Sequence, residues 1–476
     1  MNDASEAGAS VNAASVFGRL PVRLSEREYG RLDVHTTCFA YGIATWCFLT
    51  GAYAAELVGA VQGTVCLIAG NLVGVFLAAM PTALGCQRYG LEQMDYCKTA
   101  FGQHGAHIIL VFYLINMLGW SGLLLVMFGN GIFNIAGTFN AQPGDWLVGA
   151  GVALGIWLSF LVTVKGVHRI ATFNNWVTPA LGTVVLFMAW TLFRTYGWNA
   201  IAAAPPLDPG PDPLVNYAIV LELGIANGFS WWGGIGFIAR NSRTRRDSVY
   251  AQVIHLGISS AAVSCVALYA ALVVGSDDPT RWMVPLGGVL LGIVALVFVT
   301  LANITSVAVS IFAAGLALRH VPALRQRRWW QILVLTLVPC AFFVVWPQEL
   351  YDMGSAFLAY NGTMYAPICG VLFVDFFLLR GQRICLRSVF DNAPQGAYHY
   401  FKGFNVLGLA CVAIGQATYF LLYNPFSGET HALFIYLPAS MASFLVPAIA
   451  YYAGMRWYGV RVSSSAPAGP LSQPNL

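Results

Sequence analysis

Long, uninterrupted runs of apolar residues dominate the chain. Twelve segments each hold the roughly 20 mostly apolar residues that a helix needs to cross a lipid bilayer. They cover about residues 34–59, 61–85, 106–132, 146–166, 171–193, 214–239, 249–275, 283–318, 329–347, 353–379, 404–424 and 431–455. Because the connections between them are short, the pattern predicts an all-α integral membrane protein with 12 transmembrane helices.

The composition excludes a soluble protein. Of the 476 residues, 58% are hydrophobic and 9% are charged, whereas soluble chains carry about 25% charged residues. A soluble enzyme, a nucleic-acid binder and a disordered scaffold are thereby excluded. The ten cysteines are scattered through apolar runs without a C-x-x-C pair, so we interpret them as small hydrophobic residues rather than disulfide or metal ligands.

The basic residues orient the predicted helices. When the loops are assigned to alternating sides, all of the 24 lysines and arginines except Arg194 and Arg281 fall on one side. Positive residues mark the cytoplasmic side, so both termini are expected in the cytoplasm of a multi-pass protein of the cell membrane. No cleavable signal peptide is expected, because the first 33 residues are polar.

The same pattern divides the chain. Residues 1–33 form a cytoplasmic tail, 34–193 a first group of five helices, and 194–213 an extracellular proline-rich connector. Residues 214–380 form a second group of five helices, and 381–458 a cytoplasmic loop with the last two helices. Residues 459–476 are rich in Ser, Pro and Ala and are expected to be disordered.

Two helices contain signals for an interruption near the middle of the membrane. The first has Gly42 and Thr45 near its centre, and residues 227–236 of the sixth contain four glycines and two tryptophans. Glycine costs about 1 kcal/mol inside a helix, which favours breaks; close packing of helices through small residues is the alternative. The first and sixth helices occupy equivalent places in two five-helix halves of opposite topology, as expected of an inverted-repeat transporter.

The eighth segment contains one dense polar cluster. Hydroxyl oxygens of Thr305 and Ser306, together with carbonyls of a broken neighbouring helix, would suit a small hard cation. Alternatively, these hydroxyls bond back to carbonyls of their own helix.

Several segments, taken in order, resemble the nucleobase:cation symporter-1 family, in its purine and cytosine permease branch. The similarity covers roughly residues 20–390 and is carried by Gly90-Leu91, Phe101-Gly102, Gly119-Trp-Ser-Gly122, Met127-Phe128, and the stretches 239–247, 302–318 and 366–380. The resemblance implies a five-plus-five inverted repeat of the LeuT type with two additional C-terminal helices. It also implies import of a small heterocycle by cation symport, with no cofactor.

The resemblance also implies site residues. The substrate ring is expected between Trp120 and an aromatic residue of the sixth helix, which is Phe229, Trp231 or Trp232. A sodium site is expected at Ala302, Thr305 and Ser306, completed by backbone carbonyls of the first helix at Ala40 and Ile43.

The chain departs from the family pattern at polar positions. Val307, Ala308 and Val309 stand where cytosine permeases carry asparagines, and Leu124 stands where hydantoin-type members carry glutamine. Cytosine itself is therefore in doubt. Polar residues that could replace the missing set are Asn227, Asn303, Asn361 and Thr363.

Glu222 is an ionisable residue within the sixth helix, which makes it a candidate for binding a substrate N–H or a coupled proton; facing extracellular water is the alternative. The expected partners are a purine, pyrimidine or hydantoin-like ring, Na⁺ or H⁺, and the lipid bilayer, with no nucleic acid. An amino-acid or amine carrier on the same fold is the alternative function. A membrane-embedded enzyme is remote, because no H-E-x-x-H, D-x-x-D or G-x-S-x-G motif lies in the helices.

Overall fold

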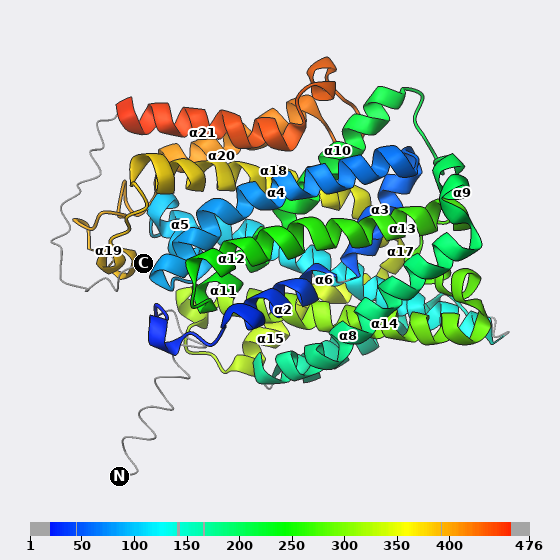
Figure 1. The fold of residues 1–476 in the computed structure, drawn as a ribbon. Coiled ribbons are helices and arrows are strands. Elements are labelled where there is room, and N and C mark those ends of the chain that lie inside the picture. Colours follow the sequence, from blue (N-terminus) through cyan, green and yellow to red (C-terminus); the bar gives the residue numbers. More distant parts are fainter. Residues whose placement is uncertain (1–19, 44, 140–142, 165–166, 392, 458–476) are drawn as a thin grey trace, which may run out of the picture.

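A computed structural model describes residues 20–43, 45–139, 143–164, 167–391 and 393–457, with the backbone alone for residues 167–178. The predicted disordered tail at 459–476 and most of the predicted N-terminal tail lie outside these residues. Long helices run side by side, with α5 and α19 at one end of the molecule and α9 at the other (Figure 1).

The first half of the chain forms helices in each of its five predicted segments. The elements of this half, some of which lie between the predicted segments, are η1 (Leu24–Glu26), α2 (Arg31–Gly42), α3 (Trp46–Leu57), α4 (Ala60–Tyr89), α5 (Gln93–Phe101), α6 (Gly105–Thr138), α7 (Trp146–Val164), α8 (Val167–Thr195) and α9 (Gly197–Ala203). The predicted first segment is two helices, α2 and α3, bent by 44°.

The second half begins after the proline-rich connector. Its elements are α10 (Pro213–Ser230), α11 (Trp232–Asn241), α12 (Arg245–Gln252), the π-helix η2 (Val253–Ser259), α13 (Ser260–Val274), η3 (Pro279–Arg281), α14 (Met283–Leu318), η4 (Pro322–Leu324), α15 (Trp329–Leu337), η5 (Val338–Ala341), α16 (Phe342–Val345), α17 (Pro347–Asp352), α18 (Gly354–Phe373) and the π-helix η6 (Val374–Leu379). A single residue, Trp231, separates α10 from α11, so the predicted sixth segment is also interrupted.

The C-terminal part contains α19 (Leu386–Phe390), α20 (Val406–Leu422), η7 (Ala432–Ile435) and α21 (Ala439–Trp457). The twelfth predicted segment starts at residue 431, which is too early: the long helix starts only at Ala439. Pro438 directly precedes that helix, where its fixed φ suits a helix start and its missing N–H costs nothing.

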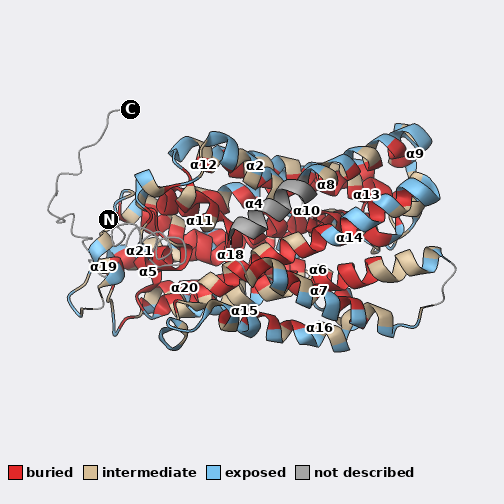
Figure 2. Cartoon of the chain, turned by 90° about the horizontal axis from the view of Figure 1, so that it is seen from below, coloured by how far each residue is buried: buried red, intermediate tan, exposed pale blue. Residues whose placement is uncertain are grey.

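Six helices among the described residues are long and apolar enough to cross a membrane, or seven if the bent pair α2 and α3 counts as one. Large apolar side chains also face outward: Leu290 of α14 is 77% exposed and Leu186 of α8 is 73% exposed. Figure 2 shows buried residues toward the middle of the bundle and exposed ones toward its outer surface. An apolar outer surface of this kind requires lipid rather than water around it.

The helices pack in two main groups. One contains α2, α3, α4, α10, α11, α12 and α13, and the other contains α6, α7, α14, α15 and α16, with α8 against α14. The first group contains the first and second predicted segments of each half of the chain. The second group contains the third and fourth predicted segments of each half. A third set, α18, α20 and α21, contact one another, and α18 also packs on α10.

Glycines allow α4 and α10 to approach closely. A Cβ atom on Gly74 would overlap backbone atoms of Ile225 and Gly228, and a Cβ on Gly228 would overlap backbone atoms of Asn71 and Gly74. Both interpretations of the glycine-rich sixth segment therefore hold, since the segment is interrupted and its glycines also make a close helix contact.

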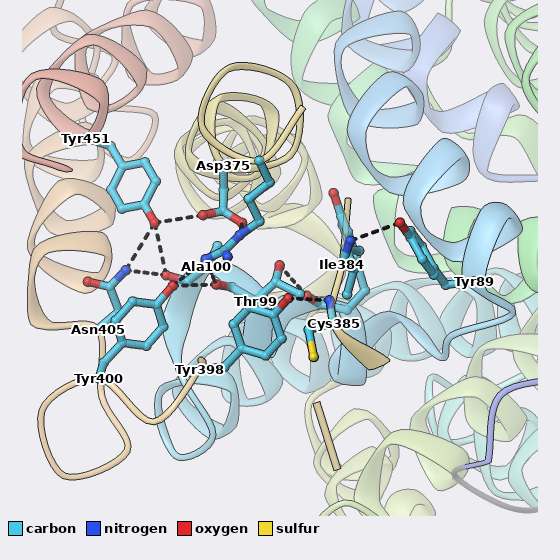
Figure 3. Close-up of polar contacts among 12 residues, drawn as sticks. Tyr89, Thr99, Ala100, Asp375, Ile384, Cys385, Tyr398, Tyr400, Asn405 and Tyr451 are labelled. Carbon is cyan, nitrogen blue, oxygen red and sulfur yellow. Dashed lines mark hydrogen bonds and ion pairs between the residues drawn. The ribbon is translucent and has the colours of Figure 1, made fainter. Parts of the chain in front are cut away.

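A polar network ties α5 to the C-terminal helices (Figure 3). Arg380 forms a salt bridge of 2.6 Å with Asp375 and donates to the Thr99 carbonyl at the end of α5. Tyr400 donates to the same carbonyl, and Tyr451 of α21 donates to Asp375. These contacts fix the end of η6 against α5 and α21.

Replacing Gly74 by alanine is expected to destabilise the protein. Alanine favours a helix over glycine by about 1 kcal/mol, but overpacking a tight contact costs about 1–3 kcal/mol. Gly137→Ala is the matched control, because a Cβ there has no atom within 4 Å. We expect a lower melting temperature of the purified protein for Gly74→Ala only; equal effects of both changes would contradict the close contact.

Candidate functional site

A small cavity lies where the two interrupted segments meet α6. Seven residues line it: Tyr41, Trp46, Met117, Trp120, Asn227, Ser230 and Trp231. They come from the end of α2, the start of α3, the middle of α6 and the junction of α10 with α11. Its volume of about 10 Å³ is close to the minimum for one water molecule, so the surrounding rings nearly fill it.

Three indole rings and a phenol form the aromatic part of the cavity wall. The ring centroid of Trp46 lies 5.6 Å from that of Trp120 and 5.2 Å from that of Trp231, with interplanar angles of 70° and 86°. Tyr41 lies 5.1 Å from Trp231 and 5.0 Å from Trp46. Trp46 therefore stands across the other two indoles rather than parallel to either.

Side chains from other helices satisfy the backbone at the interruption of the sixth segment. The Gln93 amide donates to the Trp232 carbonyl and accepts from the Gly236 N–H, both at 2.8 Å. These two backbone groups would bond each other in a regular α-helix. Tyr113 of α6 donates to the Gly233 carbonyl at 2.9 Å. Polar backbone groups freed at the break are thus held within the protein, as a membrane interior demands.

The interruption of the first segment is held against α14. The Thr45 hydroxyl, at the start of α3, donates to the side-chain oxygen of Asn303, and both residues are fully buried. Asn303 also donates to the Val299 carbonyl of its own helix. This contact brings the break in the first segment beside the polar cluster of α14.

The structure brings together some of the predicted substrate residues. Trp120, Asn227 and Trp231 line the cavity. Phe229 instead packs near Phe444 of α21, and the indole N–H of Trp232 donates to Thr82.

Asn361 and Thr363 lie on α18, outside the cavity lining. The amide nitrogen of Asn361 donates to the Phe357 and Leu358 carbonyls of its own helix.

Four lining residues were missed by sequence reasoning: Tyr41, Trp46, Met117 and Ser230. Tyr41 and Trp46 flank the Gly42–Thr45 signal that predicted the break. The signal was therefore present, because a side chain next to a helix break in a membrane lies where a solute would bind.

The predicted cation ligands lie on α14 at i, i+3 and i+4. The hydroxyl of Thr305 donates to the Ala302 carbonyl at 2.7 Å, and that of Ser306 reaches the same carbonyl at 3.4 Å. Of the predicted backbone ligands, Ile43 directly follows α2 and has non-helical angles of φ −97° and ψ 15°, while Ala40 lies within α2. Back-bonding of the hydroxyls, the alternative drawn from the sequence, is what the structure contains.

Glu222 points toward the C-terminal helices. It is fully buried and accepts hydrogen bonds from the backbone N–H of Ser440 at 3.0 and 3.2 Å and from the Ser440 hydroxyl. It does not line the cavity. These contacts connect α10 to the start of α21.

Comparison with known proteins identifies the family. The sequence profile of a family described as permeases for cytosine/purines, uracil, thiamine and allantoin matches residues 21–446. The chain belongs to this family.

Among its relatives, a purine-uracil permease of Arabidopsis thaliana is 22% identical over 425 residues, which cover 83% of this chain and 69% of that protein. A hydantoin permease of Microbacterium maritypicum is 22% identical over 440 residues, covering 88% and 87%.

Solved structures support the same fold. The inward-facing conformation of the transporter Mhp1 matches with a TM-score of 0.78 and 17% identity, over 93% of each chain. Its closed conformation with bromovinylhydantoin bound matches with a TM-score of 0.77 and 17% identity, over 94% of this chain and 97% of that one. The family match and the long apolar helices together show that the protein is membrane-embedded.

Trp120→Ala is expected to weaken binding of a flat heteroaromatic ligand by about 1–3 kcal/mol, the usual value for stacking of a base on an aromatic side chain. The readout is the rise in melting temperature of the purified protein with uracil, hypoxanthine or hydantoin. Trp157→Ala is the control, since Trp157 is 56% exposed on α7. An undiminished ligand response in Trp120→Ala would remove Trp120 from the site.

Proposed function

We propose that this chain is a secondary transporter that imports a small uncharged heterocycle by cation symport with alternating access. The solute is a purine, a pyrimidine or a hydantoin- or allantoin-like ring. The observation that carries the proposal is the cavity, whose wall combines Trp120 and Trp231 with Asn227 and Ser230. Indole faces favour flat heteroaromatic rings, and a few polar groups orient them.

The cavity also bears on the alternative function. An amino-acid or amine carrier must bind a charged group, and none of the seven lining residues is charged. Charged groups are expensive to bury without a partner, so an uncharged solute fits this wall better. Membership of a family of permeases also favours a transporter over a membrane-embedded enzyme.

Twelve membrane crossings with an inverted repeat are part of the proposal. Each of the twelve apolar segments of the sequence contains helix, although several helices are interrupted or short. The two groups of packed helices each draw equivalent segments from both halves of the chain, which supports a pseudo-symmetric core in which one group moves against the other. The membrane is the cell membrane, with both termini in the cytoplasm.

For the coupling ion we propose Na⁺ at Ala302, Thr305 and Ser306, with the Ala40 and Ile43 carbonyls completing the site. The spacing places the three α14 residues on one helix face, and the bond between Thr45 and Asn303 holds the break of the first segment against that helix. Proton coupling through Glu222 is the alternative; its carboxylate accepts from Ser440 of α21 and is not among the residues that line the cavity.

Ser306→Ala and Thr305→Val are each expected to raise the sodium concentration for half-maximal uptake. Removing one oxygen leaves the dehydrated ion short of a ligand. Both changes should also weaken solute binding, since coupling between two ligands is reciprocal and is typically about 1–3 kcal/mol.

Uptake of labelled heterocycles into proteoliposomes, with and without a sodium gradient, is the measurement. Ser310→Ala, one turn further along α14 and also buried, is the control. Uptake that ignores sodium but stops when the proton gradient is dissipated would refute the sodium site.

Cysteine labelling tests the topology. In a Cys385→Ser background, since the other nine cysteines are buried, single cysteines go to four exposed positions: Asp277, Ser427, Gln326 and Arg383. Impermeant reagents added to intact cells should label the first two and spare the last two, as the asymmetry of basic residues requires. The opposite pattern would reverse the orientation, and a mixed pattern would change the number of crossings.

A further inference from the structure

Trp46 occupies a place in the cavity that differs from those of Trp120 and Trp231. Its ring stands at 70° to Trp120 and 86° to Trp231. A solute ring stacked on either of those two indoles is parallel to it and therefore meets Trp46 nearly at right angles. Trp46 is thus turned across such a ring, whereas the indole that stacks on the ring lies parallel to it.

The indole N–H of Trp46 is a buried donor. Among the described residues it has no hydrogen-bond partner, and the same holds for the N–H of Trp231. Buried polar groups are nearly always paired in native proteins, so each exception requires an explanation. By contrast, the indole N–H groups of Trp232 and Trp282, which lie outside the cavity lining, donate to Thr82 and to the Ser276 carbonyl.

Apart from the Tyr41 hydroxyl, the other polar side chains of the cavity wall are already engaged. The Asn227 amide donates to Asn71 at 2.9 Å, and its oxygen accepts from Thr50 at 3.4 Å. The Ser230 hydroxyl donates to the Asn227 carbonyl at 2.6 Å. The wall therefore offers a solute two groups that can only donate, the indole N–H groups of Trp46 and Trp231, beside the Tyr41 hydroxyl.

Geometry distinguishes these two donors. The N–H of an indole lies in the plane of its own ring, so Trp231 cannot donate to the edge of a ring stacked on its face. Trp46 is turned across that stack and can. An indole nitrogen donates only, so its partner on the solute must be an acceptor.

We propose that Trp46 is a specificity-determining residue whose indole N–H donates to a carbonyl oxygen on the edge of the solute ring. The inference rests on the proposed function and narrows its substrate class. The transported rings are lactam-type heterocycles with an oxo group at this edge, and rings carrying an amino group there are disfavoured because two donors would face each other. Loss of a hydrogen bond to a buried polar group of the site is what makes such selection strong.

The test compares paired rings in which an oxo group is replaced by an amino group and the adjacent ring nitrogen loses its hydrogen: uracil with cytosine, and hypoxanthine with adenine. Competition against uptake of a labelled heterocycle in proteoliposomes gives the affinity ratio of each pair. The variant is Trp46→Phe, which keeps an aromatic ring and removes the N–H. Trp282→Phe is the matched control, because it removes a buried indole N–H away from the cavity.

The wild type is expected to favour the oxo member of each pair by about tenfold, which corresponds to one good hydrogen bond. In Trp46→Phe the ratio should fall toward one, chiefly through weaker binding of the oxo ring, whereas Trp282→Phe should keep it. A ratio near one in the wild type, or an unchanged ratio in Trp46→Phe, would overturn the inference.

A second measurement covers the case in which Trp46→Phe does not fold. Replacing the carbonyl oxygen by sulfur gives a weaker acceptor of similar shape, so the wild type should bind 4-thiouracil less tightly than uracil. Equal binding of the two would overturn the inference while leaving the proposed function intact. A wild type that binds no heterocycle in the panel would overturn the proposed function itself, and this inference with it.

Discussion

The membrane interior leaves no water to satisfy backbone polar groups, and this constraint shapes the site. Two helices are interrupted where the cavity forms, so their free backbone groups need partners from the protein. Gln93 and Tyr113 supply them at the start of α11. At the other break, Thr45 is fixed by Asn303 of α14. The interruptions are therefore held by neighbouring helices rather than left open.

One of these contacts, between Thr45 and Asn303, also links the two proposed binding sites in space. Trp46 in the cavity wall follows Thr45, and Asn303 follows Ala302 of the proposed cation site. The Thr45–Asn303 hydrogen bond joins the two pairs. Any change that moves the start of α3 relative to α14 acts on both sites together. A coupling free energy between solute and cation requires such a shared element.

The sequence predicted much of the fold because the lipid environment restricts it to apolar helices, and their positions follow from composition alone. It also located both interruptions, since glycine clusters inside such helices have a physical cost. It could not show which of Phe229, Trp231 and Trp232 faces the cavity. At a helix break the directions of neighbouring side chains depend on the backbone geometry, which the sequence does not specify. The roles of Gln93 and Asn303 as partners of the broken helices could not be predicted either, because they arise from contacts between segments that are distant in the sequence.

The cavity is too small to hold a solute in this conformation. A heterocycle is far larger than about 10 Å³, so the wall must open to admit it. Tyr41, Trp46 and Trp231 belong to one group of helices, whereas Met117 and Trp120 belong to the other. Separating the two groups parts Trp120 from Trp46, its ring partner across the cavity, and leaves room for a solute ring against Trp120. The solute then replaces the contacts between indoles by contacts with each face, so closing around it restores the buried aromatic area. In this arrangement the empty and the loaded site can both be closed, which an alternating-access cycle needs.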